Sequence, residues 1–122
     1  HAVEDSGCGP RRGTLEDTAV YASCGIDGYM IHHLKGRPLA DASDPLSIFQ
    51  AEVGNEKDYI STRVSYALDV MGPSVVVQSA CSSALVACVM GAQSMTSGQC
   101  RAAICGAASL TFPNMGYMYT EG

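Results

Sequence analysis

The chain has 122 residues, of which 47% are apolar and 16% are charged, so the sequence predicts one modest globular domain and excludes a disordered segment. Its net charge is −5 and its seven Lys and Arg residues are scattered, which argues against a nucleic acid or an anionic membrane surface as partner. No apolar run reaches the roughly 18 residues that a membrane-spanning helix needs.

The six cysteines form no Cys-x-x-Cys pair and no Cys/His cluster with the spacing of a zinc site. Cys88 and Cys105 lie inside apolar runs, where cysteine behaves as a small hydrophobic residue. The strand and helix patterns predict a core that needs no disulfides, so we expect reduced thiols and a cytoplasmic setting. The chain begins without Met and ends at Glu121-Gly122, and we expect residues 1–122 to be a partial domain, incomplete at both ends.

The first third of the chain predicts short elements joined by loops. Residues 1–8 carry a helical pattern that ends at Gly7, and residues 18–23 (TAVYAS) predict a short buried strand. Residues 25–34 are expected to form a loop that runs into a short helix. The glycine, prolines and aspartates within residues 35–47 predict a further loop.

A longer helix is predicted to begin near Asn55. Asn55 can serve as its N-cap, and acidic residues follow in the first turn, where the helix dipole favours them. Ile60, Val64 and Leu68 recur at helical spacing, and residues 71–73 (MGP) are expected to end the helix.

The next segment predicts a strand, a helix and a strand, at residues 74–80, 82–96 and 101–110. The first strand contains three successive valines, which is typical of a strand covered on both faces in an α/β protein. The helix is apolar nearly all round, so we expect it to be buried. This order predicts parallel strands joined by a right-handed crossover, and hence an α/β fold.

Cys81 stands where the predicted strand turns into the predicted helix. Four backbone N–H groups lack partners at the start of a helix, and the helix dipole places partial positive charge there. Both effects favour the thiolate, which is the nucleophilic form of cysteine, and the same N–H groups can donate to an oxyanion. A buried structural cysteine that begins a helix fits the local pattern as well.

The sequence around Cys81 resembles the β-ketoacyl synthase domains of type I modular polyketide synthases. Residues 78–87 (QSACSSALVA) are similar to the active-site string of that family, D-T-A-C-S-S-S-L-V-A. Residues 55–66 (NEKDYISTRVSY) are similar to its helix N-D-K-D-Y-L-A-T-R-V-S-Y. Shorter similarities lie at residues 2–7, 72–74, 97–100 and 116–122.

This resemblance implies a thiolase-like α/β fold, of which the chain would be most of the N-terminal half. It implies that Cys81 accepts an acyl chain from a carrier-protein thioester and that a malonyl-type extender then condenses with it by decarboxylative Claisen chemistry. The substrates would be carried on the phosphopantetheine of an acyl carrier protein, with no metal or redox cofactor. A homodimer is implied for the longer protein.

The sequence departs from the family pattern in two ways. Gln78-Ser79 replaces Asp-Thr, and the later histidine motifs, H-G-T-G-T and N-I-G-H, do not occur. His1, His32 and His33 match neither motif and are not assigned to catalysis; the latter two are expected on a surface helix. These residues alone are therefore not expected to condense substrates, although retention of Cys81 favours an elongating role for the longer protein.

Three other functions stay open. A fatty-acid synthase condensing enzyme would share the same motifs. A non-catalytic acyl-binding or dimerisation fragment would explain the missing histidines. A redox thiol protein would need a second cysteine near Cys81, and Cys88 is about two helical turns away along a buried stretch.

Overall fold

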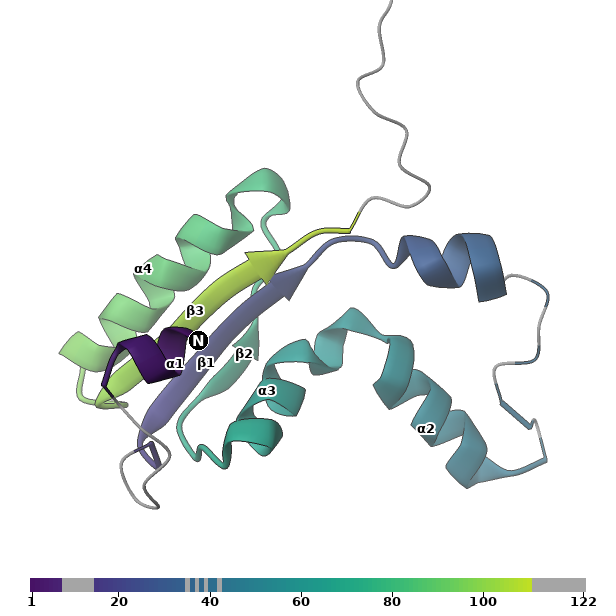
Figure 1. Cartoon of the computed structure of the whole chain (residues 1–122), viewed down its shortest axis with the longest axis horizontal. Helices are drawn as coiled ribbons and strands as arrows, with labels where there is room; N and C mark the ends of the chain where they lie inside the picture. The colour runs from purple at the N-terminus through teal and green to yellow at the C-terminus, as the bar shows by residue number, and fades with distance from the viewer. Residues whose placement is uncertain (8–14, 35, 37, 39, 42, 111–122) are drawn as a thin grey trace, which may run out of the picture.

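A computed structural model describes residues 1–7, 15–34, 36, 38, 40–41 and 43–110 (Figure 1). The predicted similarity at 116–122 lies outside these residues. Among them, no helix is long and apolar enough to cross a bilayer. The strands are β1 (Thr18–Cys24), β2 (Ser74–Val76) and β3 (Ala102–Ala108), and the α-helices are α1 (Ala2–Asp5), α2 (Pro45–Asn55), α3 (Ile60–Leu68) and α4 (Ser83–Thr96).

The three strands form a parallel sheet in the order β2-β1-β3. Tyr21 on the central strand lies opposite Val75 on one side and Cys105 on the other. The predicted strands are confirmed, and β2 and β3 are parallel as the strand–helix–strand pattern requires, with β1 lying between them. The strand predicted at residues 74–80 extends too far at its carboxyl end. Val77 still donates its N–H to the carbonyl of Ala22 at 2.9 Å, but beyond it the chain leaves the sheet.

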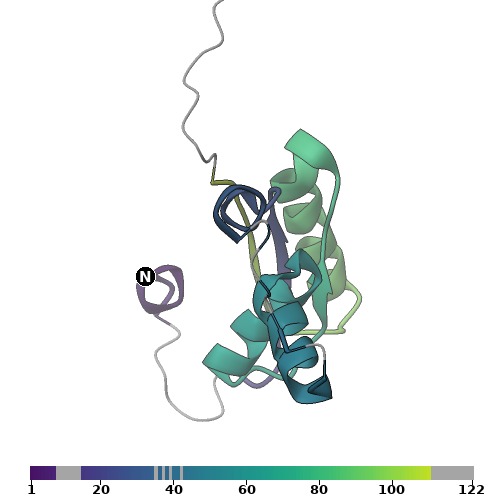
Figure 2. The ribbon, with the colours of Figure 1, turned by 90° about the vertical axis from the view of Figure 1, so that its right-hand side faces the viewer.

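Helix α4 covers one face of the sheet, and α3 lies on the other side (Figures 1 and 2). α4 approaches closely because it presents small residues: Ala87 is fully buried, and a Cβ added at Gly91 would lie 2.5 Å from the Cys105 sulfur. The core beneath α4 consists of Ala19, Tyr21, Val77, Ala87 and Cys100.

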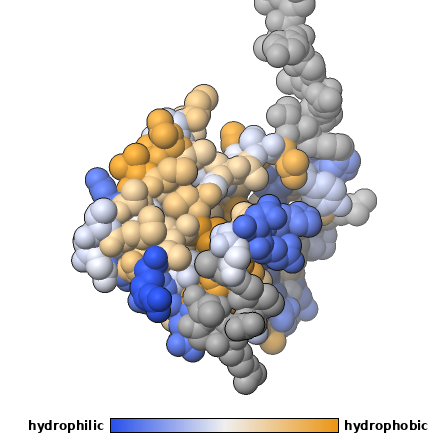
Figure 3. Space-filling view, turned by 60° about the vertical axis from the view of Figure 1, so that its left-hand side comes forward, coloured by the Kyte–Doolittle hydropathy of each residue, from blue (hydrophilic) through white to orange (hydrophobic). Residues whose placement is uncertain are grey.

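The predicted burial of the whole helix 82–96 is wrong. The outer face of α4 is apolar and open, with Leu85 69% and Val89 49% exposed. Figure 3 shows a broad apolar surface on this side of the molecule. A helix buries only the face that meets its neighbours, and α4 packs on β1 and β3. β3 is also only half-buried, and exposed toward its carboxyl end, contrary to the prediction for residues 101–110, because it is an edge strand of this sheet.

Buried serines of helix α3 hydrogen-bond to the sheet, and the buried residues of this helix are serines rather than large apolar side chains. The hydroxyl of Ser61, fully buried, accepts from the N–H of Ala22 at 3.2 Å and donates to the carbonyl of Val75 at 2.8 Å. Ser65 donates to the hydroxyl of Ser74 at 2.9 Å. One side chain of α3 therefore bridges β1 and β2, at the end of their pairing.

Helix α2 was not expected from the sequence. It begins after Asp44, whose carboxylate accepts from Leu46 and Ser47 N–H groups at 3.1 Å, with Pro45 in its first turn. The prediction that residues 35–47 form only a loop is therefore wrong at its end. Asn55 is not an N-cap but the last residue of α2, and its amide donates to the carbonyl of Ala51 at 2.6 Å.

The predicted helix after Asn55 is confirmed with other limits. A 3₁₀ turn at Lys57–Tyr59 leads into α3, which ends at Leu68 rather than at residues 71–73. Asp69 adopts φ of 53°, a left-handed conformation that stops the helix at Leu68 and that Asp tolerates better than most residues.

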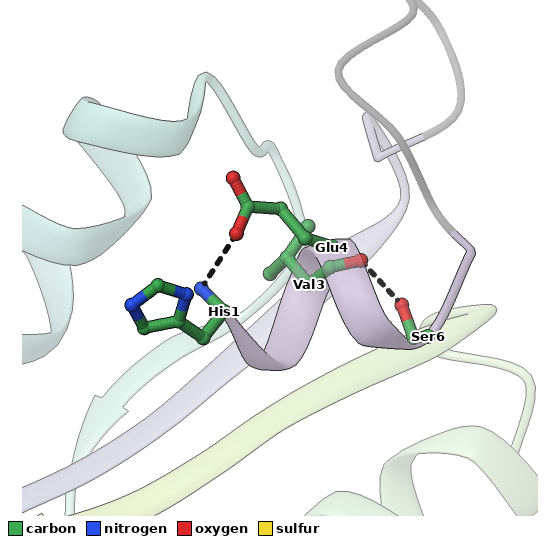
Figure 4. Close-up of polar contacts among 4 residues, drawn as sticks. All are labelled: His1, Val3, Glu4 and Ser6. Carbon is green, nitrogen blue, oxygen red and sulfur yellow. Dashed lines mark hydrogen bonds and ion pairs between the residues drawn. The ribbon is translucent and has the colours of Figure 1, made fainter.

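The two short helical segments near the amino end are confirmed. In α1 the amino group of His1 pairs with the Glu4 carboxylate at 3.2 Å, and Ser6 donates to the Val3 carbonyl at 2.7 Å (Figure 4). Gly7, with φ of 73°, ends the segment as predicted. After β1, a loop enters the π-helical turn Met30–Leu34, as expected for residues 25–34.

We predict opposite stability effects for two glycine substitutions. A Cβ at Gly72 would lie 2.5 Å from the backbone carbonyl of Thr18, so Gly72→Ala should lower the free energy of unfolding by about 1–3 kcal/mol. Gly54 in α2 has open space around it, and Gly54→Ala should raise that free energy by about 0.5–1 kcal/mol. Urea unfolding measures both; a Gly72→Ala variant as stable as the original chain would contradict the close approach.

Candidate active site at the turn between β2 and α4

Cys81 is the middle residue of a 3₁₀ turn, Ala80–Ser82, that joins β2 to α4, and its side chain is exposed. The sequence predicted it in the first turn of the helix, whereas α4 itself begins at Ser83. The turn follows the carboxyl end of β2, and ligands of parallel α/β sheets bind outside the carboxyl ends of the strands. Cys81 therefore lies at the end of the sheet where such ligands bind.

The turn holds an unusual backbone conformation. Ala80 has φ of 48°, in the left-handed region that side-chain-bearing residues rarely adopt, and Ser79 before it has φ of −142° and ψ of 39°. A left-handed residue other than glycine costs about 1–2 kcal/mol, so the surrounding structure must hold it in place.

Serine hydroxyls brace this turn from both sides. Ser83, which is buried, accepts from the N–H of Ser79 at 2.7 Å and donates to the carbonyl of Ala80 at 2.8 Å. Ser82, which is exposed, donates to the Ser79 carbonyl at 2.7 Å, and the Ser79 and Ser82 hydroxyls lie 2.8 Å apart. The sequence string 78–87 carried these serines, but their hydrogen bonds could be found only in the structure.

The N-terminus of α4 has no side-chain cap. Its N-cap residue is Ser82, whose hydroxyl is directed back to Ser79 rather than to the N–H groups of the first turn. No capping side chain therefore offsets the partial positive charge at this end of the helix. Gln78 ties the turn to the sheet, since its amide donates to the carbonyl of Cys24 at 3.3 Å.

The other described cysteines are also free thiols, in different surroundings. Cys100 is buried and donates to the Ser94 hydroxyl at 3.3 Å. Burial raises the pKa of the Cys105 thiol, and the neighbouring Cys88 and Cys100 thiols raise it further. Within the described part of the chain, no group of three His, Cys, Asp or Glu side chains could hold a metal ion.

The histidines lie on other elements than the turn. His1 begins α1, and His32 and His33 are exposed on the π-helical turn, as expected for a surface helix. The His33 ring packs against Tyr29, with ring centroids 4.9 Å apart.

An apolar cavity of about 800 Å³ lies beside α3, at the carboxyl ends of β1 and β3. Its walls do not include Cys81. Sequence reasoning missed this cavity, because the end of α2 forms part of its wall and a helix over these residues was not predicted. The lining residues include Cys24, Ile26, Tyr29, Ile60, Val64 and Leu110.

With this geometry established, comparison with known proteins decides the family. The family model described as beta-ketoacyl synthase, N-terminal domain, matches residues 1–121. The chain belongs to the β-ketoacyl synthase family. The matched range contains every described element, including the turn that carries Cys81.

Relatives of this β-ketoacyl synthase chain include polyketide synthases. A phenolphthiocerol/phthiocerol polyketide synthase protein of Mycobacterium tuberculosis is 38% identical over 129 aligned positions, covering 100% of this chain and 8% of that protein. Mellein synthase of Phaeosphaeria nodorum is 37% identical over 105 positions, covering 86% of this chain and 6% of that protein. The chain thus spans less than a tenth of the length of these relatives.

A solved structure confirms the predicted α/β, thiolase-like fold. Ketosynthase twelve from the bacillaene polyketide synthase of Bacillus amyloliquefaciens matches with a TM-score of 0.69 and 31% sequence identity. The match covers 88% of this chain and 18% of that ketosynthase chain.

The raised pKa of Cys105 gives a testable pH dependence. Alkylation requires the thiolate, so a raised pKa moves the rise in the alkylation rate to higher pH. For the folded chain we expect the Cys105 rate to reach its midpoint at a higher pH than in the chain unfolded by urea. Iodoacetamide labelling read by peptide mass spectrometry measures this; in urea the midpoint should return to the ordinary value. A midpoint in the folded chain that is no higher than the midpoint in urea would refute the role of burial.

Proposed function

We propose that Cys81 is the nucleophile that accepts the acyl chain in a polyketide synthase ketosynthase. The observation that carries the proposal is the exposed thiol on a serine-braced turn at the uncapped amino end of α4. Family membership supports the choice of thioester chemistry over an unspecialised surface thiol.

The proposed first step is a thioester exchange. The Cys81 thiolate attacks the acyl carbonyl, a carbon–sulfur bond forms, and the carbonyl oxygen becomes an oxyanion. Backbone N–H groups of the turn, that of Cys81 among them, stabilise the oxyanion. Collapse of the intermediate releases the phosphopantetheine thiolate of the carrier protein, which takes up a proton, and leaves the acyl chain on Cys81.

The condensation step is proposed for the longer protein rather than for these residues alone. A malonyl-type extender on an acyl carrier protein would lose carbon dioxide, and its carbanion would attack the acyl carbon on Cys81. The chain spans 18% of the ketosynthase it matches, and the two histidine motifs expected for this step are not in its sequence. A homodimer and a cytoplasmic, reducing setting are part of the same proposal.

A polyketide product is favoured over a fatty acid. The relatives at 38% and 37% identity bear the names of a polyketide synthase and of mellein synthase, and the matching solved structure is a polyketide synthase ketosynthase. The motifs themselves would be shared by a fatty-acid condensing enzyme, so this preference rests on the relatives alone.

We predict selective acylation of Cys81. When the chain is incubated with a short acyl thioester of N-acetylcysteamine, Cys81 should gain the acyl mass roughly tenfold faster than Cys88, because preorganised N–H donors stabilise the oxyanion only at the turn. Cys88 is the matched control, since it is also an exposed thiol of the same segment. Peptide mass spectrometry gives both rates.

The variant Cys81→Ala should leave the slower acylation of Cys88 unchanged. Equal acylation of Cys81 and Cys88 in the original chain would contradict the proposed function.

A further inference from the structure

One peptide unit sets the orientation of the groups around the nucleophile. The peptide between Ala80 and Cys81 contains both the Ala80 carbonyl and the Cys81 N–H. A trans peptide is planar, so these two groups point in opposite directions. Whatever fixes the Ala80 carbonyl therefore also fixes the direction of the Cys81 N–H, the donor proposed above for the oxyanion.

Ser83 fixes that carbonyl from inside the protein. Both its hydroxyl, at 2.8 Å, and its backbone N–H donate to the Ala80 oxygen. The same hydroxyl accepts from the N–H of Ser79 at 2.7 Å, so it spans the left-handed residue Ala80 from one side to the other. Ser83 is only 4% exposed, and water cannot readily replace these bonds.

Ser82 differs although it is adjacent and of the same type. Its hydroxyl bonds to the carbonyl and hydroxyl of Ser79 and makes no bond to Ala80. Ser82 is exposed, so water can take over its partners after substitution. The orientation of the Cys81 peptide therefore depends on Ser83 rather than on Ser82.

We propose that Ser83 is a positioning residue that acts through the Ala80 carbonyl to aim the Cys81 N–H at the oxyanion of the acyl-transfer step. This inference rests on the proposed function of Cys81 and adds a residue that determines its efficiency. Ser83 touches neither the acyl group nor the sulfur; it sets the direction of the donor.

The test compares two reactions of the same thiol. Transfer from an acyl thioester develops an oxyanion, whereas alkylation by iodoacetamide does not. In the Ser83→Ala chain the backbone N–H of residue 83 still donates to the Ala80 oxygen, but the hydroxyl that also held this carbonyl is gone. The Cys81 N–H should then be less well oriented, so the acylation rate of Cys81 should fall about tenfold while its alkylation rate changes less than about twofold. A merely structural role would slow or speed both reactions together.

Ser94→Ala is the matched control. Ser94 is a buried serine of the same helix, bonded to Gln99 and Cys100 far along α4 from the turn. We expect this variant to leave the ratio of acylation to alkylation at Cys81 unchanged. Ser82→Ala should change that ratio less than Ser83→Ala does.

If Ser83→Ala alone does not fold, the same substitution can be tested in a chain that also carries Ala80→Gly. Glycine adopts a positive φ without strain, so Ala80→Gly should restore folding of the Ser83→Ala chain without replacing the hydroxyl that orients the peptide. The ratio of acylation to alkylation should then be about tenfold lower in the Ala80→Gly, Ser83→Ala double variant than in Ala80→Gly alone.

The outcomes separate this inference from the proposed function. If the original chain does not acylate Cys81 in preference to Cys88, the proposed function fails and the role of Ser83 fails with it. Suppose instead that Cys81 is acylated selectively, but Ser83→Ala lowers acylation and alkylation equally or has the same acylation-to-alkylation ratio as Ser94→Ala. The positioning role of Ser83 is then overturned, while the assignment of Cys81 as nucleophile stands.

Discussion

The parallel pairing of β1 with two partners is the constraint on which the rest of the structure depends. β1 is buried along most of its length and receives β2 on one side and β3 on the other. Parallel pairing brings the carboxyl ends of all three strands to one edge of the sheet. The turn with Cys81, the link from Gln78 to Cys24 and the cavity beside α3 all lie at or next to that edge.

Close packing on β1 then dictates which residues can be used around it. Gly72 lies against the backbone of Thr18, and Gly91 lets α4 approach β3. Two buried serine hydroxyls make two hydrogen bonds each: Ser61 bridges β1 and β2, and Ser83 spans Ala80. A small, hydrogen-bonded side chain occupies little volume and satisfies backbone groups that would otherwise be buried without partners.

Much of this arrangement could be predicted from the sequence, since it is local. The valines of residues 75–77, the Gly72-Pro73 turn and the apolar helix after Cys81 specify strand, turn and helix without reference to the rest of the chain. Helix α2 also has a local signal, because Asp44-Pro45 is typical of a helix N-terminus. However, Gly36 and Pro38 before it, and Pro45 itself, indicated a loop. The predicted start of the next helix at Asn55 was wrong, because a residue type that is favourable as an N-cap can equally be the last residue of a helix.

The features that could not be predicted depend on contacts between distant segments or on backbone angles. An apolar helix predicts burial, yet Leu85 and Val89 lie on the face of α4 away from the sheet. When nearly every face of a helix is apolar, the sequence periodicity does not tell which face packs against a neighbour. Nothing in the residue Ala80 indicates a positive φ, which glycine would have signalled. The role of Ser83 follows only from that angle, together with the two bonds that span it.

The most direct test of the nucleophile and its donor is a crystal structure of the chain after reaction with an acyl thioester. We expect the acyl carbon bonded to the Cys81 sulfur, with its carbonyl oxygen accepting from the Cys81 N–H and the Ser83 hydroxyl still donating to the Ala80 carbonyl. An acyl group on another thiol would contradict the assignment of the nucleophile. An acyl oxygen directed away from the Cys81 N–H would contradict the function assigned to the turn.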